Sequence, residues 1–270
     1  MTEADYTDPQ THGRAPGPML QLLELRAPWE IGAALMLRPF WSLAPTGDGH
    51  PVLVLPGLTA NDGSTAVMRR FLGSLGYPVS GWGQGLNLGP REGVLDKAQA
   101  TLRRLAHQHR RKVSLIGWSL GGVYAREMAK IDPTLVRSVI TLGTPFTGHP
   151  RQTNAWRVYE LASGHKLGSH DLHGPLRAAP PVPTTSIWSR SDGVVAWQCS
   201  VEPRHHEAEN IEVEASHIGL GANPAVLYAL ADRLALPEGQ WTPFHREGWR
   251  SFVYGDTESL RHHPHPENQG

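Results

Sequence analysis

The residue best suited to covalent chemistry is Ser119, which lies in the run Gly-Trp-Ser-Leu-Gly at 117–121. The apolar run Val113–Ile116 before it predicts a buried strand, and the residues after it have helical spacing. A sharp strand-to-helix turn lifts a serine hydroxyl clear of the backbone, and glycine avoids Cβ collisions in such a turn. The pattern therefore predicts a nucleophilic Ser119 that needs Gly117 and Gly121. An idle serine in a glycine-rich turn is the alternative.

Two further side chains are spaced to activate such a serine. A serine hydroxyl needs a base to take its proton, and the base needs an acceptor that holds it in one tautomer. In proteins whose nucleophile stands on such a strand-to-helix turn, the acid comes later in the chain and the histidine comes after the acid. Asp192 follows the predicted strand Thr184–Trp188, and His217 follows the predicted strand Ile211–Val213. We therefore predict Asp192 as the orienting acid and His217 as the base; an Asp-Gly turn and a loop-capping histidine are the alternatives.

Other acids and histidines fit the chain order less well. The runner-up for the acid is Asp171. The competing histidines, none of which follows a predicted strand in the required order, are His149, His165, His170, His173, His205 and His206. The run His-His-Glu at 205–207 and the histidines at 262, 263 and 265 invite a metal site, but adjacent side chains on a strand point apart. We expect no metal and no cofactor.

The loop after the first predicted strand, Val52–Leu55, is the second region suited to this chemistry. It reads Leu-Pro-Gly-Leu over 55–58. A tetrahedral intermediate needs two N–H donors directed at its oxyanion, one from the residue after the nucleophile and one from this loop. We therefore predict Leu120 and Leu58 as the oxyanion-hole donors, with Gly57 allowing close approach of the substrate. An ordinary Pro-Gly turn is the alternative.

Strand-like and helix-like segments alternate from residue 50 onward. Apolar runs predict strands at Val52–Leu55, Tyr77–Ser80, Val113–Ile116, Val136–Leu142, Thr184–Trp188 and Ile211–Val213. Apolar residues at helical spacing predict helices at 67–75, 94–105, 119–131 and 223–236. This order indicates βαβ units and a mostly parallel sheet of about six strands, covered by helices on both faces. The expected fold class is α/β.

Residues 1–49 form a predicted N-terminal extension. Residues 1–18 are polar and read as a flexible lead-in. Residues 19–43 are apolar and are interrupted by Pro28 and Pro39, which predicts short helices. This stretch is either a segment packed on the domain, or a surface that touches lipid or forms part of a substrate lid.

The rest of the chain is divided into a main domain and a tail. Residues 50–242 have the length and pattern of one α/β domain. Its segment 146–183 is rich in Gly, Pro and His, and we interpret it as an insertion over the sheet edge. Residues 243–270 are polar, and we expect them to be a loosely held tail.

Composition limits the partners and the compartment. Lys+Arg and Asp+Glu number 25 each, so the formal net charge is +0 and no basic excess favours nucleic acid. The one cysteine, Cys199, excludes an internal disulfide and fits a reducing compartment. No secretory signal is visible at the N-terminus and no run is long enough to span a bilayer. A cytoplasmic protein is therefore expected.

These motifs resemble the α/β-hydrolase superfamily, and most closely its bacterial lipase and esterase branch, over about residues 50–236. The specific marks are Leu-Pro-Gly-Leu at 55–58, Gly-Trp-Ser-Leu-Gly-Gly at 117–122, Thr-Leu-Gly-Thr-Pro-Phe-Thr-Gly at 141–148, and the loops that carry Asp192 and His217. Phe146 stands where many such lipases have histidine. The resemblance implies a sheet that begins at the third strand of that fold, and a cap built from residues 146–183.

The resemblance also implies an activity and a substrate pocket. The activity is hydrolysis of carboxylic esters, as in an esterase or lipase, through an acyl-enzyme on Ser119. The substrate is a small-molecule or lipid ester. The residues that could line the acyl pocket are Trp118, Phe146, Trp156 and Val194. A thioesterase or an acyltransferase would use the same three side chains, and a binding module on a hydrolase scaffold is a third interpretation.

Overall fold

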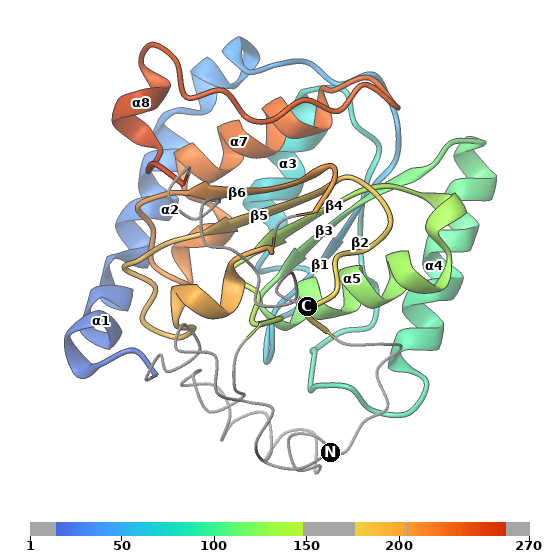
Figure 1. The fold of residues 1–270 in the computed structure, drawn as a ribbon, viewed down its shortest axis with the longest axis horizontal. Helices are drawn as coiled ribbons and strands as arrows, with labels where there is room; N and C mark the ends of the chain where they lie inside the picture. The colour runs from blue at the N-terminus through green and yellow to red at the C-terminus, as the bar shows by residue number, and fades with distance from the viewer. Residues whose placement is uncertain (1–14, 148–175, 204, 258–270) are drawn as a thin grey trace, which may run out of the picture.

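The structure is a computed structural model that describes residues 15–147, 176–203 and 205–257. Six parallel strands form one sheet in the order β2-β1-β3-β4-β5-β6 (Figure 1). The strands are β1 Val52–Leu55, β2 Val79–Gly81, β3 Val113–Trp118, β4 Val136–Leu142, β5 Thr184–Trp188 and β6 Ala208–Glu212. The predicted α/β class with a parallel sheet is confirmed. In the described part of the chain no strand precedes β1, as the resemblance implied.

Helices cover both faces of the sheet (Figure 1). The longer ones are α2 Ala27–Met36, α3 Ala66–Ser74, α4 Val94–His109, α5 Leu120–Ile131 and α7 Pro224–Leu234. Alternate side chains of β1 enter two separate cores: Val52 and Val54 pack with α3 and α7, whereas Leu53 and Leu55 pack with α4 and α5. Because strand side chains alternate between faces, an unbroken apolar run is what a doubly covered strand requires.

The last strand begins and ends earlier than predicted. β6 spans Ala208–Glu212 instead of Ile211–Val213, and Val213 pairs with Tyr254 in an antiparallel bridge. Along β6 only alternate residues are buried, because it is the edge strand of the sheet. A search for apolar runs misses the first half of this strand because it contains the buried Glu209 and the partly buried Asn210.

The apolar N-terminal stretch is helical, as predicted, and packs against the domain. It contains α1 Pro18–Leu23, α2 and two short 3₁₀ helices, η3 Glu24–Arg26 and η4 Arg38–Leu43. Pro28 and Pro39 stand in the first turns of α2 and η4. They begin these helices, because the missing N–H of proline is not needed in a first turn. Ala34 and Trp41 are buried in the same core as β1 and α7.

The predicted tail is not loosely held over residues 243–257. Tyr254 is buried and its hydroxyl donates to the Ala225 carbonyl at 2.9 Å. Phe244 packs edge-on against Tyr254, and its backbone N–H donates to Glu209 at 2.7 Å. The prediction was wrong here because isolated aromatic residues between polar ones give no periodic pattern. Residues 258–270 lie outside the described part of the chain.

One buried arginine contacts both ends of the predicted insertion. Arg126 of α5 is buried, pairs with Glu202, and donates to the Ala178 carbonyl at 3.0 Å. Its guanidinium lies 3.8 Å from the centre of the Phe146 ring. Residues 148–175, and with them most of the predicted cap, lie outside the described part of the chain, so the cap stays a prediction.

Candidate active site

Ser119 stands at the turn between β3 and α5 in a strained backbone conformation. Its φ is 53° and its ψ is −122°, values that an L residue adopts only when its surroundings impose them. The Ser119 N–H donates to the Leu142 carbonyl at the end of the neighbouring strand β4, at 2.8 Å. The serine therefore lies at the carboxyl edge of the sheet, as predicted.

The glycines beside Ser119 allow close backbone contacts. A Cβ added at Gly121 would lie 2.2 Å from the Leu55 carbonyl oxygen, and one added at Gly117 would lie 2.3 Å from the Cα of Gly122. Neither neighbour is a flexible side chain, so any larger residue would force the turn apart. Both glycines are needed for this geometry.

The residues that carry the predicted oxyanion-hole donors, Leu58 and Leu120, lie close to the serine along the chain or in space. Gly57 is so close to Ser119 that an added Cβ would lie 3.2 Å from the serine Cβ. Among the described residues, the N–H groups of Leu58 and Leu120 donate to no protein acceptor. Leu120 is also the first residue of α5, where the helix dipole is positive. The role of the two N–H groups as oxyanion-hole donors stays a prediction.

Asn87 holds residues 56–60, the predicted oxyanion loop, and was not identified from the sequence. It is fully buried, and its side-chain amide donates to the Pro56 carbonyl at 2.8 Å. Its backbone carbonyl accepts from Thr59 at 2.7 Å, and its backbone N–H donates to Ala60 at 2.8 Å. Its segment, 82–90, has no strand or helix pattern, so only the three-dimensional contacts reveal this role.

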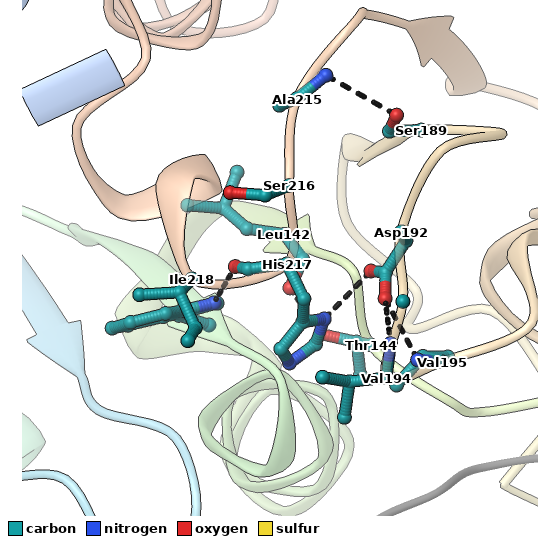
Figure 2. A network of polar contacts seen from close by, with 12 residues as sticks. Leu142, Thr144, Ser189, Asp192, Val194, Val195, Ala215, Ser216, His217 and Ile218 are labelled. Atoms are coloured by element: carbon teal, nitrogen blue, oxygen red, sulfur yellow. Dashed lines mark hydrogen bonds and ion pairs between the residues drawn. The ribbon is translucent and has the colours of Figure 1, made fainter. Parts of the chain in front are cut away.

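Asp192 and His217 meet at the ends of β5 and β6 (Figure 2). The His217 Nδ1 lies 2.6 Å from the Asp192 Oδ2, and both side chains are buried. The other carboxylate oxygen, Oδ1, accepts from the backbone N–H groups of Val194 at 2.8 Å and Val195 at 2.7 Å. The carboxylate is therefore fixed on both sides, and it can hold the imidazole with its proton on Nδ1.

The end of β4 lies between Ser119 and the Asp192–His217 pair and contacts both. Gly143 directly follows Leu142, and a Cβ added at Gly143 would lie 3.0 Å from the Asp192 Oδ2 and 3.1 Å from the His217 Nδ1. Trp118, next to the serine, donates from Nε1 to the His217 carbonyl at 3.1 Å. The described hydrogen bonds include none between the Ser119 hydroxyl and the His217 ring. Serine, acid and histidine thus share one edge of the sheet, with the acid and histidine already bonded.

The charges around His217 favour the protonated form of its imidazole. Burial lowers the pKa of the imidazole, but the Asp192 carboxylate, by its charge and its hydrogen bond, and the more distant Glu24 outweigh it. The pKa of His217 is therefore raised above the ordinary value of 6.5. A ring that readily accepts a proton is what a general base requires.

Three of the four predicted pocket residues lie among the described residues, and each packs against other side chains. Trp118 is buried in the core beside α7, Phe146 is covered by Arg126, and Val194 packs with Val195 and its neighbours. Trp156 lies outside the described residues. The acyl pocket stays a prediction.

The two competing histidines that lie within the described residues are not near Ser119. His205 and His206 are exposed and lie before β6. The candidates outside the described residues are Asp171, His149, His165, His170, His173, His262, His263 and His265. Within residues 15–147, 176–203 and 205–257, no group of three or more His, Cys, Asp or Glu side chains could hold a metal ion.

A second Asp–His–Ser arrangement lies at the opposite edge of the sheet. His50 Nδ1 lies 2.5 Å from Asp48 Oδ1, and its Nε2 lies 2.8 Å from the Ser114 hydroxyl. Ser114 and His50 are fully buried, and Ser114 also bonds Ser138 at 2.9 Å. Ser114 stands inside strand β3, with no strained turn and no helix beginning beside it. This array joins β1, β3 and β4 at their amino ends.

Comparisons with known proteins identify the fold class of the chain. No protein-family model and no curated protein matches the chain. Lipase B of Aspergillus fumigatus matches with a TM-score of 0.57 and 18% identity, over 72% of this chain and 54% of that protein. A structure of the metagenome-derived lipolytic enzymes LipS and LipT matches with a TM-score of 0.52 and 17% identity, over 70% of this chain and 93% of that one.

A pyrethroid hydrolase from Sphingobium faniae matches with a TM-score of 0.50 and 14% identity, over 69% of this chain and 98% of that enzyme. The chain therefore has the α/β-hydrolase fold, and the resemblance seen in its motifs is confirmed for the fold. It spans about half the length of lipase B. At these identities fold alone is shared, so activity rests on the site.

Proposed function

We propose that the protein hydrolyses carboxylic esters through an acyl-enzyme on Ser119. The observation that carries the proposal is the buried Asp192–His217 hydrogen bond beside a serine in a strained strand-to-helix turn. Catalytic hydrogen bonds are often longer in free enzymes and shorten with substrate, which fits an unbonded Ser119 hydroxyl.

The proposed reaction has two halves. The Ser119 Oγ attacks the ester carbonyl carbon while His217 Nε2 takes the hydroxyl proton, and the N–H groups of Leu58 and Leu120 stabilise the oxyanion. The imidazolium then protonates the departing alcohol oxygen, which leaves an ester between Ser119 and the acyl group. Water, deprotonated by the same imidazole, attacks that ester; the imidazolium then returns the proton to the departing Ser119 Oγ, and the acid is released. Asp192 keeps the proton on Nδ1 throughout and stabilises the imidazolium.

Labelling with a fluorophosphonate tests the proposal, because this probe reacts only with an activated serine. We expect labelling at Ser119 of the full chain, mapped by mass spectrometry, and hydrolysis of nitrophenyl esters. An unlabelled protein would contradict the proposal and support a binding module on a hydrolase scaffold. The same ester panel, of rising chain length, run beside acyl-CoA esters with and without an alcohol acceptor, separates an esterase from a thioesterase or an acyltransferase.

Lipid or lipid-like esters are the proposed substrate class, supported by the apolar outer face of the N-terminal segment. Within residues 19–43 the exposed fractions reach 82% for Trp29 and 81% for Met36. The other exposed apolar side chains of this segment are Met19, Leu22, Leu23, Leu25, Leu35, Leu37, Phe40 and Leu43. No helix in the described residues is long and apolar enough to cross a bilayer, so the proposed contact is peripheral.

Vesicle binding tests this contact. Replacing Trp29 and Met36 with serine should lower co-sedimentation with phospholipid vesicles and should leave hydrolysis of a short soluble ester unchanged. Equal binding of the variant and the native chain would contradict the proposed contact. The cytoplasmic location expected from the sequence stays a prediction.

Asn87→Ala tests the oxyanion loop, whose backbone donors cannot be removed by side-chain substitution. The change leaves the Pro56 carbonyl without its donor, so the loop that carries Leu58 loses its position. A shift of about 1 Å at a reacting centre can cost about 10²-fold in rate, and we expect a loss of kcat of that order.

The control is Gln99→Ala, which removes another buried amide, one that donates to Asp132 at 2.7 Å far from the serine. Both variants should lose similar thermal stability, but only Asn87→Ala should lose kcat. Equal turnover per active site in the two variants would show that the loop does not depend on Asn87.

The pH dependence follows from the raised pKa of His217. The base works only when neutral, so kcat/KM should fall as the pH is lowered through this pKa. Because the pKa is raised, we expect the midpoint of the acid limb above the ordinary value of 6.5. A pH series with a soluble nitrophenyl ester measures it. A midpoint below 6.5, or activity that stays constant down to pH 4, would contradict a base bonded to a carboxylate.

A further inference from the structure

The loops that carry the acid and the base are both held by one carboxylate from outside the sheet. Glu24 of η3 accepts through Oε1 from the backbone N–H groups of Gly193 and His217, each at 2.8 Å. Its Oε2 accepts from the N–H of Ile218 at 3.0 Å. Gly193 directly follows Asp192 in the acid loop. The Glu24 carboxylate therefore joins the two loops next to Asp192 and at His217.

The surrounding contacts fix Glu24 in place. A Cβ added at Gly193 would lie 2.3 Å from the Leu20 carbonyl oxygen, so α1 lies directly on the acid loop. Arg26, on the same short helix as Glu24, donates from Nη2 to the Ser191 hydroxyl at 2.5 Å. The segment thus contacts the acid loop on both sides of Asp192.

A second carboxylate of the segment binds the base loop alone. Glu30 of α2 accepts from the backbone N–H of Ser216 at 2.9 Å and from its hydroxyl at 2.6 Å. That hydroxyl also accepts from the Gly219 N–H at 2.9 Å. Both acidic side chains of this apolar segment therefore turn inward, where backbone N–H groups compensate their charge.

We propose that Glu24 is a positioning residue: by binding the backbone of the acid loop and the base loop at once, it sets the distance and angle between Asp192 and the His217 ring. The inference rests on the proposed function of this pair. A carboxylate is suited to the task because it accepts from several N–H groups at fixed angles, and its negative charge favours the imidazolium that forms during the reaction.

The test compares Glu24→Gln and Glu24→Asp in the full chain. The glutamine has nearly the same shape but directs an NH₂ group at backbone donors and carries no charge. The aspartate keeps the charge but is too short to bind all three N–H groups. Glu92→Gln, an exposed acid far along the chain before α4, is the control for loss of one charge.

Rates are divided by the active-site concentration titrated with fluorophosphonate, which removes effects of misfolded protein. For Glu24→Gln we expect kcat to fall about 10-fold with KM unchanged, because alignment of the pair and not ester binding is altered. Its acid limb should also move to lower pH, because a negative charge near His217 is lost while Asp192 remains. Glu24→Asp should lose kcat with the acid limb near its original pH, and Glu92→Gln should match the native chain.

Hydrogen exchange of the intact protein gives a readout that does not depend on activity. Peptides covering 190–195 and 215–219 should exchange faster in Glu24→Gln. An unchanged kcat and acid limb per active site would overturn the inference, and so would a variant that loses only thermal stability. If the native chain is labelled at Ser119, such a result overturns the positioning role alone. If the native chain is not labelled, the proposed function fails and the positioning role fails with it.

Discussion

Replacing Ser119 with alanine should lower kcat by about 10⁴–10⁶-fold and leave the folded structure intact. The hydroxyl makes no hydrogen bond among the described residues, so its removal breaks none. The backbone N–H, which donates to the Leu142 carbonyl, remains. Residual hydrolysis should come from the oxyanion-hole donors and from substrate binding. Steady-state kinetics with a nitrophenyl ester and a thermal melt measure the two effects.

The matched control is Ser114→Ala at the opposite edge of the sheet. Ser114 is a buried serine whose hydroxyl is bonded to a histidine, and that histidine is bonded to an aspartate. Its loss should cost about 1 kcal/mol of stability through the missing hydrogen bonds and leave turnover per folded molecule unchanged. Native-like activity in Ser119→Ala, or loss of activity in Ser114→Ala with Ser119 labelled normally, would show that the serine was assigned wrongly.

Comparison of the two Asp–His–Ser groups explains why the order of residues along the chain predicted the one with Ser119 and not the one with Ser114. Ser119, Asp192 and His217 each follow a strand, and in a parallel sheet all such positions meet at one edge. Apolar runs reveal these strands without any knowledge of long-range contacts. Asp48 and His50 precede β1, and Ser114 lies inside β3, so no rule of strand order marks them as partners.

The positioning residues could not be predicted in the same way. Glu24 contacts loops whose sequence separation exceeds 160 residues, and Asn87 comes from a loop without periodicity. A glutamate at a helix surface normally faces solvent, so its sequence neighbourhood gives no sign that it binds backbone N–H groups. The contact depends on how the N-terminal helices pack, which local patterns do not determine.

Asp192→Asn is expected to have the second largest effect, a loss of about 10⁴-fold in kcat, although it changes one atom. The argument follows from the contacts of each carboxylate oxygen. Oδ1 accepts from Val194 and Val195, so in the asparagine this position must hold the carbonyl oxygen. The amide NH₂ then takes the place of Oδ2 and faces His217 Nδ1, 2.6 Å away in the native chain. It can only donate there, so the imidazole carries its proton on Nε2 and cannot accept one from the serine.

The control for this change is Asp48→Asn, which alters the equivalent carboxylate of the other array. Asp48 also pairs with Arg111 and with the buried Arg137, so this variant should lose stability but keep kcat per active site. In Asp192→Asn the fold should stay intact, because both backbone N–H bonds survive, and NMR of the ring nitrogens should show the proton moved from Nδ1 to Nε2. An Asp192→Asn variant with native kcat would mean that the Asp192–His217 bond only stabilises the loops, and that the base at this sheet edge is a different group.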